Sequence, residues 1–252
     1  MSSISSISQN YYSQISSGKS ILRAADGPAE SAVIQRGKSQ IAGYQAGTRN
    51  AQDGQSVLNI SDAALSSIGD QLSRMRELAV KASNSATLSD GDRKIIQGEI
   101  EQLKQGISDI ASNTQFNTKN LLDGSNHGMH IATGSDGSGM SLDTGNATLE
   151  ALGIADFDVT GKFSIKTIDK AIQKVSENRS SIGAQSNALG YAIGYNTNTA
   201  YQLTSAVGRM EDTDIAEMVT ELKKNQVLQT YRFMMQKKQS EMEQKKLSMF
   251  YM

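Results

Sequence analysis

The sequence of 252 residues contains no cysteine and no tryptophan, and Pro28 is its single proline. Without thiols the chain has no disulfides, thiolate metal sites or cysteine nucleophiles. Aromatic residues make up 5% of the chain, which is low for a large rounded core. An elongated bundle packs with Leu, Ile, Met and Ala instead, so the composition favours that kind of protein.

Charge of one sign and long apolar runs are also missing. The 25 basic and 26 acidic residues leave a net charge of −1, so we expect no general attraction to nucleic acid or to anionic membranes. No stretch approaches the roughly 20 apolar residues of a membrane span. Residues 1–18 carry no charge and lack the basic and apolar regions of a signal peptide, so we expect any export to use another route.

Residues 168–210 carry the clearest pattern that is present. Apolar side chains recur there in alternating steps of four and three, with polar residues at Arg179, Ser186 and Asn196. This spacing predicts one long helix that packs along a narrow seam. A helix of that kind needs other long helices beside it.

Two further stretches have the same periodicity and predict these partners. In residues 45–85, Leu58, Leu65 and Leu72 are seven apart, and in residues 89–114 isoleucines and a leucine follow steps of four and three. We expect the first helix to resume at about Gln45, after a break at residues 24–28. Ser89 with an acid three residues later predicts a capping box.

Residues 124–161 differ from the helical stretches because they are rich in glycine and short alternating runs. Residues 129–133 and 140–143 flank the glycine-rich stretch 134–139, which predicts a β-hairpin with a flexible loop.

Both ends of the chain predict helices with narrow apolar seams. The N-terminal segment is rich in serine, so we expect it to be disordered alone and helical with a partner. A frayed tail is the alternative. After an N-cap at residues 211–214 we expect a last helix with its seam at Ile215, Met218 and Leu222 and then at Leu228, Met235, Met242 and Met249. The predicted assembly seam comprises Ile4, Ile7, Tyr11, Ile15, Leu228, Met235, Met242 and Met249.

Short motifs in both halves of the chain point to one family. They are Ser16–Lys19, Ala24–Asp26, Asn50–Gly54, Arg74–Val80, Glu99–Ile100, Thr114–Gly124, Arg179–Gln185 and Arg209–Ala216. These collinear motifs resemble bacterial flagellin over about residues 14–230. The resemblance implies a secreted protein of the bacterial flagellum that supports motility and polymerises with copies of itself. It also implies an export chaperone and a cap protein as partners.

The resulting fold prediction is mainly α: an elongated bundle of long helices with a small β-hairpin, plus paired terminal helices. We divide the chain into an N-terminal assembly helix and spoke (1–42), a rod-shaped helical domain with a hairpin at about 124–161 (43–210), and a C-terminal assembly helix (211–252). The chain departs from the family at both ends. The segment before Ser16 is shorter than usual, and residues 231–252 carry charges where the family ending is apolar and amide-rich.

The resemblance also implies a contact surface. Arg74, Leu78 and Glu99 match the positions that bind the vertebrate innate receptor TLR5 in many flagellins and that contact neighbouring subunits. An exposed Arg and Leu one turn apart make a good pair of anchors for a partner. The alternative is that Leu78 packs inside and Arg74 pairs only with Asp70.

The sequence predicts no catalytic or metal site. His127 and His130 are the two histidines, and no third ligand is convincingly placed beside them. No nucleophile–base arrangement stands out, so we expect no cofactor, no metal and no enzymatic activity. Our first hypothesis is a structural flagellin that assembles as its termini fold. The alternatives are a minor or junction protein of the same family, a coiled-coil adaptor, or a secreted receptor ligand that does not polymerise.

Overall fold

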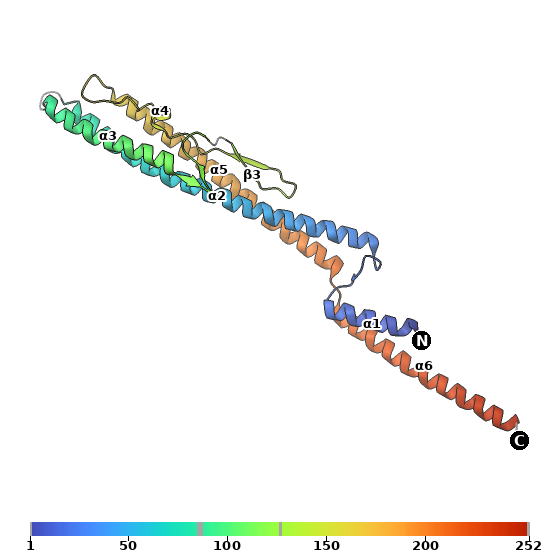
Figure 1. Cartoon of the computed structure of the whole chain (residues 1–252). Coiled ribbons are helices and arrows are strands. Elements are labelled where there is room, and N and C mark those ends of the chain that lie inside the picture. The colour runs from blue at the N-terminus through green and yellow to red at the C-terminus, as the bar shows by residue number, and fades with distance from the viewer. Residues whose placement is uncertain (1, 85–87, 126–127, 251–252) are drawn as a thin grey trace. The chain divides into compact units, whose positions relative to one another are not determined.

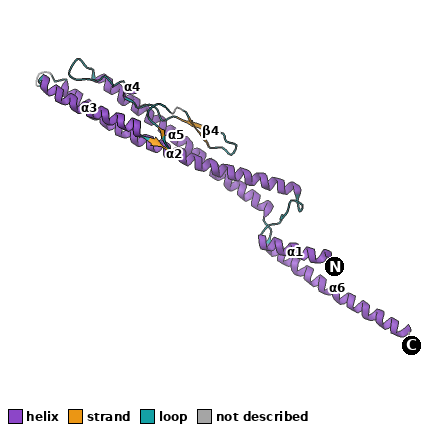
Figure 2. Ribbon diagram, in the orientation of Figure 1, coloured by secondary structure: helices purple, strands orange, loops and turns teal. Residues whose placement is uncertain are grey.

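The computed structural model describes residues 2–84, 88–125 and 128–250 (Figure 1). It contains helices α1 (Ser2–Ser17), α2 (Pro28–Ala82), α3 (Asp90–Asn113), α4 (Leu149–Leu152), α5 (Ile165–Glu211) and α6 (Ile215–Phe250). Strands are short and lie between α3 and α4 in the chain (Figure 2). The chain divides into a central unit, residues 42–200, and a terminal unit made of residues 1–41 and 201–252. The predicted mainly helical fold is confirmed.

The core of the central unit is built by the heptad positions of three helices. Leu58, Leu65 and Leu72 of α2 are fully buried, and so are Ile100 of α3 and Leu189 of α5. These side chains belong to one apolar cluster that α2, α3 and α5 share. The predicted packing of the long helix against two earlier helices of the same chain is therefore confirmed.

Local sequence explains where two of these helices begin. α2 starts at Pro28 and runs without interruption to Ala82, so the expected resumption at Gln45 is wrong. Proline suits the first position of a helix because its missing N–H would have no partner there. The predicted capping box of α3 is present, with Ser89 Oγ accepting from Asp92 N at 3.2 Å and Asp92 Oδ2 accepting from Ser89 N at 2.9 Å.

Two antiparallel strand pairs follow α3. β3 (Met129–Ala132) pairs with β4 (Gly139–Leu142), with Met129 opposite Leu142, and this is the predicted hairpin. The pair β1 (Gln115–Phe116) and β2 (Lys119–Asn120) was not predicted. Its two-residue turn holds Asn117 and Thr118 at φ of 46° and 65°, as a type I′ hairpin turn requires.

Side-chain amides hold the β3–β4 hairpin on the helices. Asn50 Nδ2 of α2 donates to the Ala132 carbonyl at 2.9 Å, and the buried Asn196 Nδ2 of α5 donates to the Thr133 carbonyl at 2.7 Å. Gly47 of α2 lies under the same carbonyl, where an added Cβ would come within 2.1 Å of the Thr133 oxygen. The helix therefore needs glycine at this position for the hairpin backbone to approach.

A third amide docks the end of β4. The Gln185 side chain of α5 accepts from the Asp143 backbone N–H and donates to the Asp143 carbonyl, both at 2.8 Å. One amide thus satisfies two backbone groups that have no further strand to pair with. Of the polar seam positions singled out in the sequence, Asn196 holds the hairpin and Arg179 binds Asp62 of α2 at 2.8 Å.

The terminal unit contains the paired terminal helices, and Figure 1 shows α1 lying along α6. The predicted N-cap of α6 is Asp214, whose Oδ1 accepts from Ala216 N at 2.9 Å and Glu217 N at 3.2 Å. The proposed boundaries at residues 42 and 210 between assembly segments and rod domain stay a prediction.

Replacing Gly47 with alanine should destabilise the central unit, because the new methyl group collides with the Thr133 carbonyl and separates the hairpin from α2. We expect a loss of about 1–3 kcal/mol, as for other overpacked positions. Thermal unfolding followed by circular dichroism measures it. The matched control is Gly98→Ala on α3, where a Cβ would meet no atom within 4 Å. That change should raise stability by up to about 1 kcal/mol through helix propensity. Equal behaviour of the two variants would contradict this account.

Candidate functional site

The first part of α6 packs on α1. Leu222 of α6 is 8% exposed, and Tyr11 and Ile15 of α1 are half-buried. Gln226 Nε2 donates to the Tyr12 hydroxyl at 3.1 Å. The pairing of α1 with α6 therefore combines a narrow apolar contact with polar contacts at its edge.

The predicted seam residues of α1 are only partly described. Ile4 and Ile7 lie in α1, but their side chains fall outside the described part of the structure. Their contacts, and the role of all eight seam residues in assembly, stay a prediction.

α6 carries a covered stripe and a separate exposed stripe instead of one seam. Met218, Leu222, Asn225 and Gln229 form the covered stripe, whose members are buried or half-buried. Leu228 follows Leu222 by six residues, which places it about 120° around the helix. The expectation that Met218, Leu222 and Leu228 share one seam is therefore wrong.

The second stripe lies about a quarter turn around the helix from the covered one. It consists of Leu228, Met235, Met242 and Met249, which are 45%, 43%, 54% and 75% exposed, and we call it the exposed stripe. Its members are seven residues apart, as in helices that pair along one seam. Apolar side chains that stay exposed at regular spacing indicate a partner surface. Every residue from Tyr231 to Lys246 is exposed as well.

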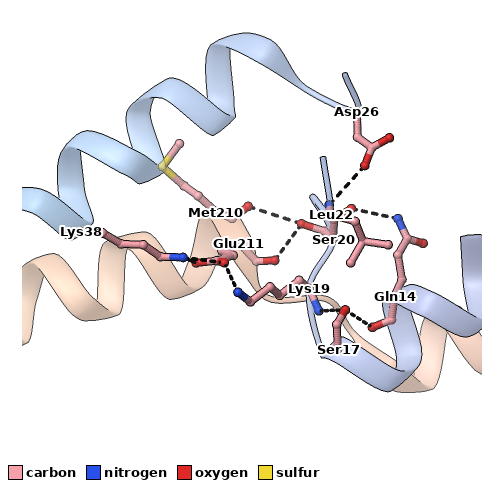
Figure 3. A network of polar contacts seen from close by, with 9 residues as sticks. All are labelled: Gln14, Ser17, Lys19, Ser20, Leu22, Asp26, Lys38, Met210 and Glu211. Carbon is pink, nitrogen blue, oxygen red and sulfur yellow. Dashed lines mark hydrogen bonds and ion pairs between the residues drawn. The ribbon is translucent and has the colours of Figure 1, made fainter. Parts of the chain in front are cut away.

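A polar network joins α5 and α2 of the terminal unit to the segment after α1 (Figure 3). The Glu211 carboxylate at the end of α5 is 12% exposed and receives two lysines. Lys38 Nζ of α2 lies 2.7 Å from Glu211 Oε1, and Lys19 Nζ lies 2.9 Å from the same oxygen. Two cations on one nearly buried carboxylate fix three segments at one point.

Backbone hydrogen bonds reinforce this network. Ser20 N donates to the Glu211 carbonyl at 2.7 Å, and Thr213 N donates to the Gly18 carbonyl at 3.0 Å. The two connecting segments, after α1 and before α6, thereby pair like short antiparallel strands. Asp26 closes the turn before α2 by accepting from Leu22 N and Arg23 N (Figure 3 shows the Leu22 bond).

The network changes the titration of its members. The hydrogen bonds from Lys38 and Lys19 hold the pKa of Glu211 below its ordinary value. The same contact with Glu211 raises the pKa of Lys19. A carboxyl group whose pKa is lowered by folding stabilises the fold above its unfolded pKa, and this contribution disappears as the pH falls through the folded pKa.

The three residues predicted to contact a receptor or another subunit are arranged differently from the expectation. Arg74 Nη2 lies 2.7 Å from Glu99 Oε1 of α3, and Arg74 Nη1 lies 3.0 Å from Glu77 Oε2, so Arg74 does not pair with Asp70 alone. Leu78 is 4% exposed and belongs to the core, so its expected exposure is wrong. Arg74 and Glu99 remain on the surface, where their contact role stays a prediction.

α5 presents a surface that we did not predict. Residues 180–208 contain no charged residue and no histidine. Within this run Tyr191 and Tyr195 are 81% and 63% exposed. The Tyr195 ring packs edge-on against Tyr44 of α2, with 6.2 Å between centroids. Exposed tyrosine without neighbouring charge is typical of the centre of protein interfaces. The charge-free run was the signal available in the sequence.

The described residues carry no grouping of three or more His, Cys, Asp or Glu side chains suited to hold a metal ion. His130 in β3 has one ring nitrogen 3.5 Å from the Gly137 carbonyl, and His127 lies outside the described residues. Among the described helices none is long and apolar enough to cross a membrane. The features that stand out in the described residues are the exposed stripe of α6 and the charge-free run of α5.

Comparison with known protein families identifies both helical halves of the chain. The model of the bacterial flagellin N-terminal helical region matches residues 1–127, and that of the C-terminal helical region matches residues 165–250. The chain belongs to the bacterial flagellin family. It is 34% identical over 227 residues to a flagellin of Halalkalibacterium halodurans, covering 87% of this chain and 83% of that protein.

Other flagellin relatives extend the likeness. The chain is 34% identical to the flagellar filament 33 kDa core protein of Treponema phagedenis, over 87% of this chain and 84% of that one. The crystal structure of Bacillus cereus flagellin matches 59% of this chain and 88% of its own, with 32% identity and a TM-score of 0.53. A putative flagellar hook-associated protein from Vibrio parahaemolyticus shares the fold, with 18% identity, a TM-score of 0.58 and coverage of 74% and 100%.

Acidification should weaken the Glu211 network. The lowered pKa of Glu211 means that its stabilisation is present at neutral pH and lost as the pH falls below the ordinary carboxyl value of about 4.3. The test uses wild-type protein with α1 and α6 folded. The protection of the Ser20 and Thr213 amides against hydrogen exchange, measured relative to the intrinsic rate at each pH, should be lower at pH 3.5 than at neutral pH. Glu211→Gln should show weak protection at both pH values. Mass spectrometry of exchanged peptides measures this.

The matched control for that experiment is Glu99→Gln, which removes a carboxylate bound to Arg74 on the central unit. It should leave protection of Ser20 and Thr213 unchanged at either pH. Equal protection of these amides in wild type and Glu211→Gln at neutral pH would refute the role assigned to the network.

Proposed function

We propose that the chain is a structural subunit of a bacterial flagellar filament, which assembles from many copies and supports motility. Membership of the flagellin family and the relatives named as flagellins and filament core protein support this function. The observation that carries it here is the exposed stripe of α6, a seven-residue apolar repeat that α1 leaves uncovered. A subunit needs such a surface because its contacts are completed by its neighbours.

Assembly and folding of the terminal helices are coupled in this proposal. α1 contains eight serines among its 16 residues, and the side chains of residues 231–246 are all exposed, so neither segment has a core of its own. Helices with so little tertiary contact are marginal in water. They fold when a neighbouring subunit covers their apolar stripes, and ordering then accompanies binding.

The contacts between copies use unlike surfaces, so each added copy leaves the next surface open and a helical filament results. The charge-free face of α5 with Tyr191 and Tyr195 suits the centre of one such contact. The role of the chain is structural and not enzymatic.

The family relationship supports proposals on location and further partners. We place the working protein outside the cell, in the flagellum. An export chaperone and a cap protein act before and during assembly, and Arg74 and Glu99 contribute to a surface for neighbouring subunits or TLR5. Neither nucleic acid nor a membrane is a partner in this scheme.

Purified protein should elongate short filament seeds, as seen by negative-stain electron microscopy. Met242→Asp, on the exposed stripe, should reduce the elongation rate by about tenfold or more, since burying a methionine side chain contributes about 1.5–3 kcal/mol. Gln244→Asp is the control, because it adds the same charge on the opposite side of α6. Wild-type protein that never elongates would rule out the filament function and favour a ligand or adaptor that does not polymerise.

Unassembled protein should lose its ends to trypsin, with cleavage after residues such as Lys19, Arg36 and Lys224. We expect removal of roughly the first 40 and last 40 residues and a resistant core, because disordered segments are cleaved first. Mass spectrometry of the digest identifies the boundaries, and the assembled form should resist at the same sites. Uniform resistance of the unassembled chain would contradict coupled folding.

A further inference from the structure

One aromatic pair of the central unit joins two helices that are far apart in the sequence. Tyr44 of α2 and Tyr195 of α5 meet edge-on, with 6.2 Å between their ring centroids and 76° between their planes. Tyr195 is 63% exposed and Tyr44 is half-buried, so both rings are accessible from solvent. The other aromatic pair of the described residues, Phe157 with Phe163, carries no hydroxyl group. Within the described part of the chain, Tyr44 and Tyr195 are therefore the paired phenols.

The β3–β4 hairpin fixes the backbone around this pair. Asn196, the residue after Tyr195, donates to the Thr133 carbonyl at 2.7 Å. Gly47, less than one turn from Tyr44 on α2, lies so close to the same carbonyl that an added Cβ would come within 2.1 Å of its oxygen. The hairpin thus rests on both helices beside the two rings. The separation of the rings then varies mainly through their own side-chain torsions.

Two phenols in contact can be joined by oxidation. Removal of one electron and one proton from each hydroxyl group gives two phenoxyl radicals, whose unpaired electrons are shared with the ring carbons beside the hydroxyl-bearing carbons. One such carbon of each ring forms the new carbon–carbon bond. The proton that each of these carbons carried then moves to the oxygen of its own ring. Both hydroxyl groups are restored, and the joined pair has lost two hydrogen atoms.

The composition of the chain directs one-electron oxidation to tyrosine. Cysteine and tryptophan, the other side chains that readily give up a single electron, are absent. Methionine reacts with peroxide by accepting an oxygen atom, which forms no link between residues. A disulfide is excluded because the chain has no thiols. Coupling of tyrosines is therefore the oxidative cross-link that this composition allows.

We propose that Tyr44 and Tyr195 form a modification site, at which a heme peroxidase acting with hydrogen peroxide joins the two rings by a carbon–carbon bond. The peroxide takes up the two electrons and two protons that the phenols release and becomes two molecules of water. Because the rings are already in contact within one copy, their coupling needs no encounter between chains. The site goes beyond the proposed filament function and reacts in the unassembled chain, where no neighbouring copy covers Tyr195.

The new bond fastens α2 to α5 near the ends of the central unit. Tyr44 and Tyr195 stand close to the first and last positions of residues 42–200, which make up that unit. The cross-link closes a loop of about 150 residues, and a covalent link across so long a loop stabilises a fold chiefly by restricting the unfolded chain, as in disulfides. The central unit thereby gains a covalent staple without cysteine.

Treatment of dilute, unassembled protein with a heme peroxidase and hydrogen peroxide tests the proposal. Trypsin then releases residues 39–49, which contain Tyr44, and residues 180–209, which contain Tyr195. Mass spectrometry should find these two peptides joined, with a mass lower than their sum by two hydrogen atoms. The intact oxidised chain should still migrate as a monomer on a denaturing gel. Its central unit should unfold about 10 °C or more above that of the untreated protein.

Single substitutions identify the linked rings, because residues 180–209 also contain Tyr191 and Tyr201. Tyr44→Phe and Tyr195→Phe should each lower the yield of the joined peptides at least about tenfold, since phenylalanine keeps the ring packing but forms no phenoxyl radical and the remaining phenols lack the same proximity. The matched control is Tyr191→Phe. It removes a phenol that is 81% exposed, one turn from Tyr195, and should leave the yield unchanged.

Joined peptides in wild type that disappear in both phenylalanine variants and persist in the Tyr191→Phe control would support the site. Joined peptides that persist in Tyr44→Phe or Tyr195→Phe would overturn it, and so would coupling that occurs mainly between copies. Oxidation of exposed tyrosines without any joined peptides would also refute it. Seeded elongation of untreated wild type tests the filament function separately, so the failure of one proposal is distinguished from the failure of the other.

Discussion

Burial of narrow apolar stripes is the constraint on which the rest of the structure depends. A helix that is apolar along one seam gains stability only when that seam is covered. In the central unit the requirement is met within the chain, because Leu58, Leu65 and Leu72 of α2 meet apolar positions of α3 and α5. Low aromatic content is sufficient there, since interlocking aliphatic side chains fill the space between parallel seams.

The terminal unit meets the same requirement only halfway. α1 covers one side of the first part of α6, and the exposed stripe stays uncovered. The difference between a buried stripe and an exposed one thus separates what the chain does alone from what it does with copies of itself. The flagellin family relationship and the pattern of burial both support a central unit that is stable by itself and a terminal unit that is completed by other copies.

Periodicity in the sequence was sufficient to predict the long helices, the hairpin and both N-caps, because each of these depends on residues close together in the chain. It failed where phase or long-range contacts decide. The six-residue step from Leu222 to Leu228 shifts the apolar positions about 120° around α6, so the residues before and after it do not form one seam. Leu78 was placed on the surface by family resemblance, although it follows Leu72 and Met75 along the buried seam. No local signal identifies the Thr133 carbonyl as the partner of Asn196, because 63 residues separate them.

The amides that fasten the hairpin have a consequence for the conditions the protein tolerates. Asn50, Asn196 and Gln185 bind backbone groups without using any ionisable atom. Such bonds neither titrate nor weaken by ionic screening, unlike contacts between charged side chains. The hairpin should therefore keep its place in brackish, acidic or alkaline surroundings. This attachment suits the proposed location outside the cell, because it does not depend on the salt concentration or pH of the medium.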